Sequence, residues 1–239
     1  MTERLYLQSA VLTGEARVVE ISHGDVSTLR LNQTLFHPRG GGQPADRGAL
    51  ILADGSGVAV PVIDVRNGDA GAVDHVIASD AALRLGDQVL MRVDADSRRL
   101  HARLHSAGHL VALAGERIEP RLRGIAGHHW PGEARVEFEG LAANPEDFER
   151  ALRSMLEEMR AANLPISASL DGDGRRSIAI DLAAPVPCGG THVAETAAIG
   201  RIDIRKIKIK AGRVRVSYDI EPWRVGDNKQ ARDPADKVE

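Results

Sequence analysis

A change of sequence pattern at Asp94 constrains the fold of this 239-residue chain more than any other feature. Before Asp94, short runs rich in Val, Ile and Leu alternate with turn sequences such as HGD, ADGSG and RNGDAG, and no helix of ordinary length is indicated. The expected strands are ARVVEIS, STLRLNQTLF, GALILAD, GVAVPVIDV and DQVLMRVD. Short strands at such close spacing predict a small β-barrel or a β-sandwich.

The chain after Asp94 begins with a helical pattern. A helix is predicted over residues 96–117 by apolar residues at helical spacing, namely Leu100, Leu104, Ala107 and Val111. A second helix is predicted from Asn144, a suitable N-cap, and Pro145, a suitable first residue, to about residue 163. Its apolar stripe consists of Phe148, Leu152, Met155, Leu156 and Met159.

Strand patterns flank the second helix. EARVEFEG precedes it, PISASLD and SIAIDL follow it, and RIDIRKIKIKAGRVRVSYDI predicts two strands around Ala211–Gly212. The tail, residues 224–239, has no apolar pattern and is expected to be mobile. We therefore expect an α+β protein with two domains, residues 1–94 and residues 95–239.

Composition excludes several classes of protein. The formal net charge of −3 does not describe a polycation for nucleic acid, and an aromatic content of 3% argues against a platform for stacked bases. No signal-peptide pattern and no run of about 18 apolar residues is present, so we expect no contact with a membrane. A single Cys cannot form an internal disulfide, which is typical of a reducing cytoplasm.

Three histidines follow one another at four-residue intervals, at His101, His105 and His109. This spacing places all three on one helical face, and two imidazoles one turn apart can hold a metal ion. The zinc proteases with HExxH use that geometry, but the residues between His105 and His109 are SAG, without a Glu to act as base. A helix whose histidines are hydrogen-bonded or solvated is the alternative.

PCGGTHV, residues 187–193, contains the single Cys of the chain. Cys188 and His192 lie four positions apart, and the Gly pair between them allows a tight backbone turn around an ion. Together with two helical imidazoles they offer four nitrogen and sulfur donors, a set that suits zinc. Two alternatives stay open, a structural zinc and a Cys that is only a small buried hydrophobe.

FHPRGGGQPADRG, residues 36–48, is rich in glycine but lacks both GK[ST] and GxGxxG. It is typical either of a tight turn between strands or of a loop whose backbone N–H groups approach a ligand.

In chain order, GGGQPADRG, HSAGH and PCGGTHV resemble the editing domain of alanyl-tRNA synthetase and its free-standing relatives, the AlaX proteins. The likeness covers nearly the whole chain, since VDADSRRLHARLHSAGHL and GHHWPGEARVEFEG also resemble family segments. It implies an N-terminal small β-barrel domain, as in the medium-length AlaX type, followed by an α+β alanyl/threonyl-tRNA editing domain.

The resemblance implies a zinc-dependent hydrolase that removes serine or glycine from tRNA for alanine. One zinc ion would be held by His105, His109, Cys188 and His192, whereas His101 matches no ligand position. A water molecule bound to zinc would attack the ester, and no side-chain base is assigned. Candidate substrate contacts are Gly41, Gly42, Gln43 and Thr191.

The chain departs from the family pattern just before the glycines. Relatives often have Tyr-Pro-Thr there, with the Thr linked to reading the serine hydroxyl, whereas this chain has His37-Pro38-Arg39. A site that accepts serine and rejects alanine needs a polar partner for that hydroxyl. Candidates for that partner are Thr34, Ser106, Thr191 and Gln43.

The expected partner is tRNA, and the sequence indicates no obligate protein partner. Candidate phosphate contacts are Lys206, Lys208 and Lys210 on one strand face, with Arg98, Arg99 and Arg103 near the histidine helix. A solvated strand face is the alternative for the lysines. Two other functions stay open, a zinc esterase with another acyl or aminoacyl-tRNA substrate and a non-catalytic RNA-binding module with structural zinc.

Overall fold

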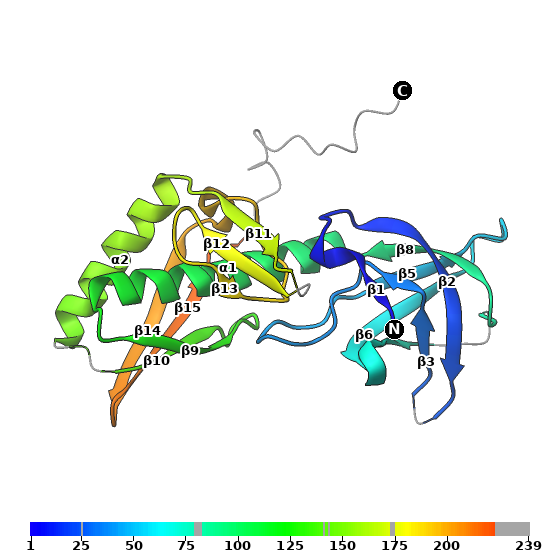
Figure 1. Ribbon diagram of the computed structural model, residues 1–239, viewed down its shortest axis with the longest axis horizontal. Coiled ribbons are helices and arrows are strands. Elements are labelled where there is room, and N and C mark those ends of the chain that lie inside the picture. The colour runs from blue at the N-terminus through cyan, green and yellow to red at the C-terminus, as the bar shows by residue number, and fades with distance from the viewer. Residues whose placement is uncertain (25, 79–82, 141, 143, 173–174, 223–239) are drawn as a thin grey trace.

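The computed structural model describes residues 1–24, 26–78, 83–140, 142, 144–172 and 175–222. Figure 1 shows a β-barrel at one end, with the long helix α1 (Ala95–Ile118) leading from it across the remaining strands. The content is mixed α+β, as expected. The predicted mobile tail, residues 224–239, lies outside the described residues.

Six strands of the N-terminal part close into a barrel, so the barrel alternative is correct. Closure depends on β2, which pairs antiparallel with both β3 and β8. The inward side chains, such as Leu29, Leu50 and Met91, are fully buried. Around the barrel the strands are β2 (Thr13–Ser22), β3 (Thr28–Leu31), β7 (Val73–Ile77), β6 (Ala59–Asn67), β5 (Gly48–Leu52) and β8 (Gln88–Val93).

The N-terminal part also contains several short elements. Strands β1 (Glu3–Arg4) and β4 (Gln33–Thr34) form a two-stranded parallel sheet. Two 3₁₀ turns are η1 (Leu5–Leu7) and η2 (Asp69–Gly71).

Helix α1 begins at the end of the barrel, where the Asp94 side chain accepts a hydrogen bond from the Ser97 N–H. A four-stranded antiparallel sheet packs against it in the order β14 (Ile202–Lys210), β15 (Arg213–Ile220), β10 (Arg135–Glu139) and β9 (Arg123–His128). Ala211 and Gly212 form the predicted turn between β14 and β15, both with positive φ.

The second predicted helix is α2 (Pro145–Ala161), and the Asn144 side chain caps it by accepting from the N–H groups of Glu146 and Asp147. A three-stranded sheet follows, with β11 (Ile166–Leu170), β12 (Arg176–Ile180) and β13 (Val186–Pro187), and then η3 (Thr196–Ile199). Neither α1 nor α2, the helices of the described chain, has the length and apolar character needed to cross a membrane.

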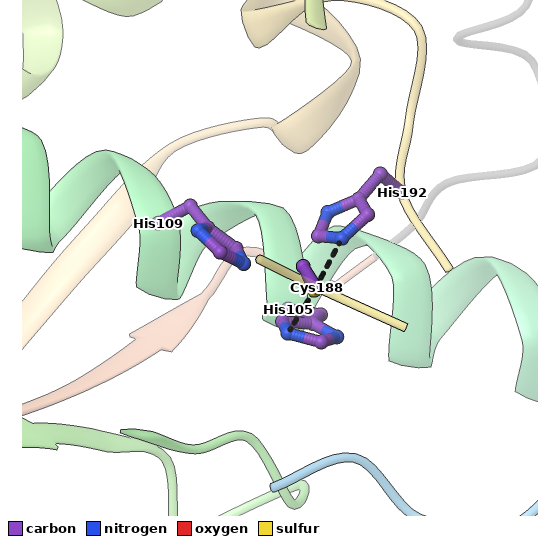
Figure 2. Close-up of side chains that lie close together, drawn as sticks. All are labelled: His105, His109, Cys188 and His192. Carbon is purple, nitrogen blue, oxygen red and sulfur yellow. Dashed lines mark hydrogen bonds between the residues drawn. The ribbon is translucent and has the colours of Figure 1, made fainter. Parts of the chain in front are cut away.

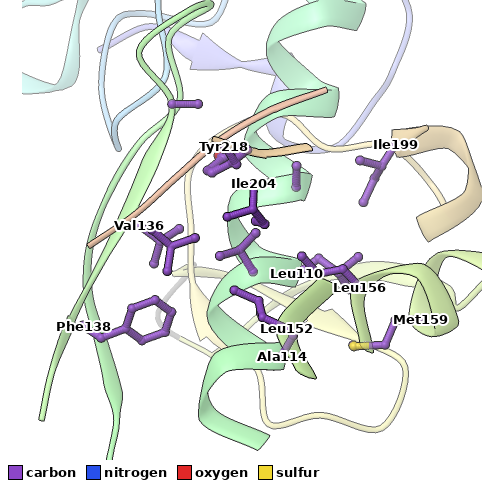
Figure 3. Packing of buried hydrophobic residues seen from close by; sticks show 14 of the residues in the cluster. Leu110, Ala114, Val136, Phe138, Leu152, Leu156, Met159, Ile199, Ile204 and Tyr218 are labelled. Atoms are coloured by element: carbon purple, nitrogen blue, oxygen red, sulfur yellow. The ribbon is translucent and has the colours of Figure 1, made fainter. Parts of the chain in front are cut away.

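Apolar side chains from α1, α2 and the four-stranded sheet form one buried cluster, separate from the barrel interior. Leu110, Leu152 and Phe138 meet in it (Figure 3), which places the predicted stripe of the second helix in the core. Burial of this kind stabilises by roughly 25 cal/mol per Å² of apolar surface.

A buried ion pair fixes the barrel against α1. The Arg98 guanidinium donates to both carboxylate oxygens of Asp46 and to the Leu35 carbonyl. Because Asp46 and Arg98 are almost fully buried, removing either one would leave an uncompensated charge. The glycine-rich loop that contains Asp46 is thereby held next to the histidine-bearing face of α1.

Candidate metal centre

Three histidines and the single Cys meet beside α1 (Figure 2). Helix α1 supplies His105 and His109 one turn apart, and the loop after β13 supplies Cys188 and His192. The potential ligand atoms of these four residues all lie within 4.8 Å of one another. His101, on the same helix face, is not part of this cluster, and its Nδ1 is buried without a hydrogen-bond partner.

The donor spacing fits a zinc ion. The Cys188 sulfur lies 3.5 Å from Nε2 of His105 and 3.2 Å from Nε2 of His192. In a tetrahedral site with ordinary zinc–nitrogen and zinc–sulfur bonds, a nitrogen and a sulfur ligand lie about 3.5 Å apart. Three imidazoles and one thiolate are also donors of the type that zinc prefers.

Gln43, from the glycine-rich loop, sets the tautomer of His105. Its Oε1 accepts from the Thr191 N–H at 2.9 Å and from His105 Nδ1 at 2.8 Å, and its Nε2 donates to Thr191 Oγ1. Because Oε1 can only accept, the proton of His105 lies on Nδ1 and its Nε2 presents a lone pair toward Cys188. Gln43 thus connects the barrel to both halves of the cluster.

The other ligand-bearing segments are held by side chains of their own. Ser106 Oγ accepts from the Val193 N–H and hydrogen-bonds Nδ1 of His192 at 3.2 Å. Arg176, from β12, donates to the carbonyls of Cys188 and Gly190 and so shapes the loop between them. Sequence patterns did not single out Arg176, because it has no motif around it.

Gly190 lets this loop approach α1 closely. A Cβ placed there would lie 2.1 Å from Cε1 and 2.2 Å from Nδ1 of His105, a separation that no side chain tolerates. At Gly189 a Cβ would meet no atom within 4 Å. The second glycine of PCGGTHV is therefore required because the loop lies so close to His105, and not because of a positive φ.

Burial keeps the cluster histidines neutral. It lowers the pKa of His105 and of His192 well below the ordinary value, and it lowers the pKa of His109 to about 4. Burial also raises the pKa of the Cys188 thiol, and the nearby Arg176 charge opposes that rise. Neutral imidazoles are ready to bind a metal, whereas the thiol has to lose its proton on binding.

A cavity of about 490 Å³ opens beside the cluster. His105, His109 and Cys188 line it, and Ile125, Ile178 and Val186 contribute apolar walls. Gly41, at the tip of the glycine-rich loop, also lines it. The cluster is therefore open to a space that can hold a small organic group.

The glycine-rich loop is both a tight turn and a neighbour of the site. Gly40 and Gln43 exchange backbone hydrogen bonds across Gly41 and Gly42, which both have positive φ. The Gly42 carbonyl accepts from the His129 N–H at 2.8 Å, and a Cβ on Gly42 would lie 2.3 Å from the Gly127 oxygen. The loop tip is therefore packed against the strand β9.

The remaining candidate residues have varied positions. Gln43 and Thr191 are buried and bond to each other, and Thr34 Oγ1 hydrogen-bonds His75 in the barrel. Arg39 pairs with Asp64 and lies over the Trp130 ring. It is not among the residues that line the cavity.

The candidate tRNA contacts divide into exposed and buried cations. Lys206, Lys208 and Lys210 are exposed on β14, while Ile207 and Ile209 pack against the core. Arg98 is buried against Asp46. Arg103 is buried with hydrogen bonds to the carbonyls of Ile199 and Glu221, and Arg99 is half-buried.

Comparisons with known proteins identify relatives of this chain. Residues 5–97 match the family model described as tRNA synthetases class II (A). The alanyl-tRNA editing protein AlaX-M of Pyrococcus horikoshii is 29% identical, over 92% of this chain and 99% of its own length. AlaX-M of Saccharolobus solfataricus is 31% identical, over 93% of this chain and 100% of its own. The alanine–tRNA ligase of Frankia alni is 31% identical over 84% of this chain, which corresponds to 25% of the ligase. From the shared motifs and the full-length match, we conclude that the chain belongs to the AlaX family of alanyl-tRNA editing proteins.

Proposed function

We propose that this protein hydrolyses the ester bond of mischarged aminoacyl-tRNA, with seryl- or glycyl-tRNA for alanine as substrate, and that zinc is its cofactor. The observation that carries the proposal is a cluster of three imidazoles and one thiol that opens onto a cavity of about 490 Å³. We also propose that residues 1–94 and 95–239 are its two domains, because each has its own buried cluster.

His105, His109, Cys188 and His192 would hold the ion. When bound, zinc polarises a carbonyl and lowers the pKa of coordinated water to about 7, which suffices for an activated ester. Gln43 orients the imidazole of His105, and Arg176 orients the loop that carries Cys188. The cavity would receive the aminoacyl ester next to these donors.

Access to the cluster favours catalysis over a purely structural zinc. Structural sites are closed by four protein ligands, whereas catalytic sites keep one position open for water or substrate, so one of the four donors here would give way to water during hydrolysis. Here His105, His109 and Cys188 all line the cavity. This observation also argues against the RNA-binding module with structural zinc.

Deacylation assays test the proposal directly. Zinc-loaded protein is expected to release serine or glycine from tRNA for alanine while alanine is spared. His109→Ala is expected to abolish turnover, and His23→Ala, at an exposed position of the barrel part, serves as control. No turnover of any aminoacyl-tRNA, or undiminished turnover by His109→Ala, would refute the proposal.

The exposed lysines of β14 are proposed phosphate contacts, whereas the burial of Arg98 and Arg103 argues against such a role for them. Replacing Lys206, Lys208 and Lys210 with Gln is expected to weaken tRNA binding. The slope of log affinity against log salt would fall by up to about 3, because each phosphate contact releases about one counterion. Arg121→Gln, at an exposed cation paired with Glu119, is the control. An unchanged slope would assign the lysines to a solvated face.

A further inference from the structure

His129 is a buried histidine next to the cluster that the proposed ligand set does not include. It directly follows β9, and its ring stacks on that of His105 with centroids 4.5 Å apart and planes 21° apart. It also lines the cavity. A polar side chain in this position faces whatever occupies the cavity beside the cluster.

The protein determines which nitrogen of His129 carries the proton. The Tyr218 hydroxyl donates its hydrogen to the Leu104 carbonyl at 2.9 Å, and a carbonyl can only accept. Its contact with Nδ1 of His129, at 2.7 Å, must therefore be donated by the imidazole. In the neutral ring with its proton on Nδ1, Nε2 is a hydrogen-bond acceptor.

Three glycines form a cradle for this ring. A Cβ at Gly108 would lie 2.2 Å from Cε1, one at Gly127 would lie 2.4 Å from Nε2, and one at Gly42 would lie 3.2 Å from Cδ2. The described residues provide no hydrogen-bond partner for Nε2, and this atom is not among the unpaired atoms that the protein encloses. The ring is thus held in place with one acceptor left for a ligand.

The four residues that the sequence offered as partners for a serine hydroxyl are already engaged. Gln43 and Thr191 bond to each other, and Ser106 bonds to His192 and Val193. Thr34 bonds to His75 inside the barrel part. None of these four residues lines the cavity, whereas His129 lines it and has a free lone pair on Nε2.

We propose that Nε2 of His129 accepts a hydrogen bond from the side-chain hydroxyl of the substrate, and that it thereby selects serine against alanine. Tyr218 is the positioning residue, because its hydroxyl keeps the His129 proton on Nδ1. The proposal rests on the proposed function. Arg39 pairs with Asp64 and does not line the cavity, so it does not contact the hydroxyl there. We assign this recognition to His129 instead.

Binding of stable substrate analogues tests this role without turnover. The probes are the 3′-amide analogues of seryl-, glycyl- and alanyl-adenosine, titrated into zinc-loaded protein by calorimetry. We expect the serine amide to bind roughly tenfold more tightly than the glycine and alanine amides, a ratio that corresponds to the net free energy of one hydrogen bond. His129→Asn keeps a donor for Tyr218 but has no acceptor at the Nε2 position, so it should remove the serine preference. His129→Gln, which can place an oxygen there, should restore part of it.

The outcomes separate this proposal from the proposed function. An unchanged serine-to-glycine ratio in His129→Asn, or an equal loss for all three amides, would overturn the role of His129 alone. A wild-type protein that binds none of the amides would overturn the proposed function and this role with it. A second measurement needs no variant, since nitrogen NMR of ¹⁵N-histidine-labelled protein should show His129 protonated at Nδ1. Protonation at Nε2 would overturn the proposal.

Discussion

Replacing Gln43 with Met is the most direct perturbation of the candidate metal centre that leaves its four donors in place. Met has a similar length but cannot form the three hydrogen bonds of the Gln43 amide. The N–H of Thr191 and Nδ1–H of His105 would then be buried without their partner. The variant therefore separates the orientation of the ligands from their identity.

The expected magnitude follows from these lost contacts. A buried donor without a partner costs about 1–3 kcal/mol, so two of them should destabilise the metal-free protein by about 2–6 kcal/mol. Loss of the group that orients a ligating imidazole typically weakens metal binding by about 10–100-fold. We expect both effects, since His105 would be free to adopt the other tautomer.

Two measurements check this prediction. Competition with a chromogenic chelator gives the zinc affinity, and urea unfolding in EDTA gives the free energy of unfolding of the metal-free protein. Gln33→Met is the matched control, because Gln33 is half-buried and donates only to the Glu15 carbonyl of the barrel part. If Gln43→Met bound zinc as tightly as the wild type, orientation of His105 by Gln43 would not matter for the site.

Two further predictions concern packing and pH. Gly190→Ala should weaken zinc binding by at least about tenfold, because the added Cβ would collide with His105. Gly189→Ala is the control and should bind zinc normally. Equal zinc affinities of the two variants in a chelator competition would contradict the packing argument. His75 is fully buried in the barrel, and burial lowers its pKa from 6.5 to about 4. Between these values the unfolded chain binds more protons than the folded one, so stability falls as pH decreases from 6.5 toward 4, by about 3 kcal/mol from this residue. His75→Gln should flatten that part of the profile in urea unfolding, and an unaltered profile would show that His75 does not cause it.

Local sequence signals predicted most of the regular elements. Asn144 and Pro145 mark the start of α2, and the turn at Ala211–Gly212 joins β14 to β15, because caps and tight turns depend on a few adjacent residues. Four strands escaped prediction, and two of them, β1 and β13, have only two residues each. β9, RGIAGH, is glycine-containing and largely exposed, and β7, VDHVI, is buried at four of five positions, so neither alternates clearly.

Closure of the strands into a barrel could not be predicted from the sequence and is seen only in the tertiary structure. The strand runs suited a sandwich equally well, and only the pairing of β2 with β8, at opposite ends of the barrel part, decides between them. Such a long-range pairing leaves no mark on local periodicity.

The candidate ligands were accessible from sequence because helical spacing brings His105 and His109 together and a short loop does so for Cys188 and His192. The same spacing could not exclude His101. Family resemblance did so, and the fold agrees, because the loop after β13 crosses α1 beside His105 and leaves His101 outside the cluster. By itself, then, the sequence determined the chemistry of the donors and their local spacing. The tertiary structure decided what surrounds them: Gln43 on His105, Arg176 on the Cys188 loop, and His129 locked by Tyr218, each through contacts between residues far apart in the chain.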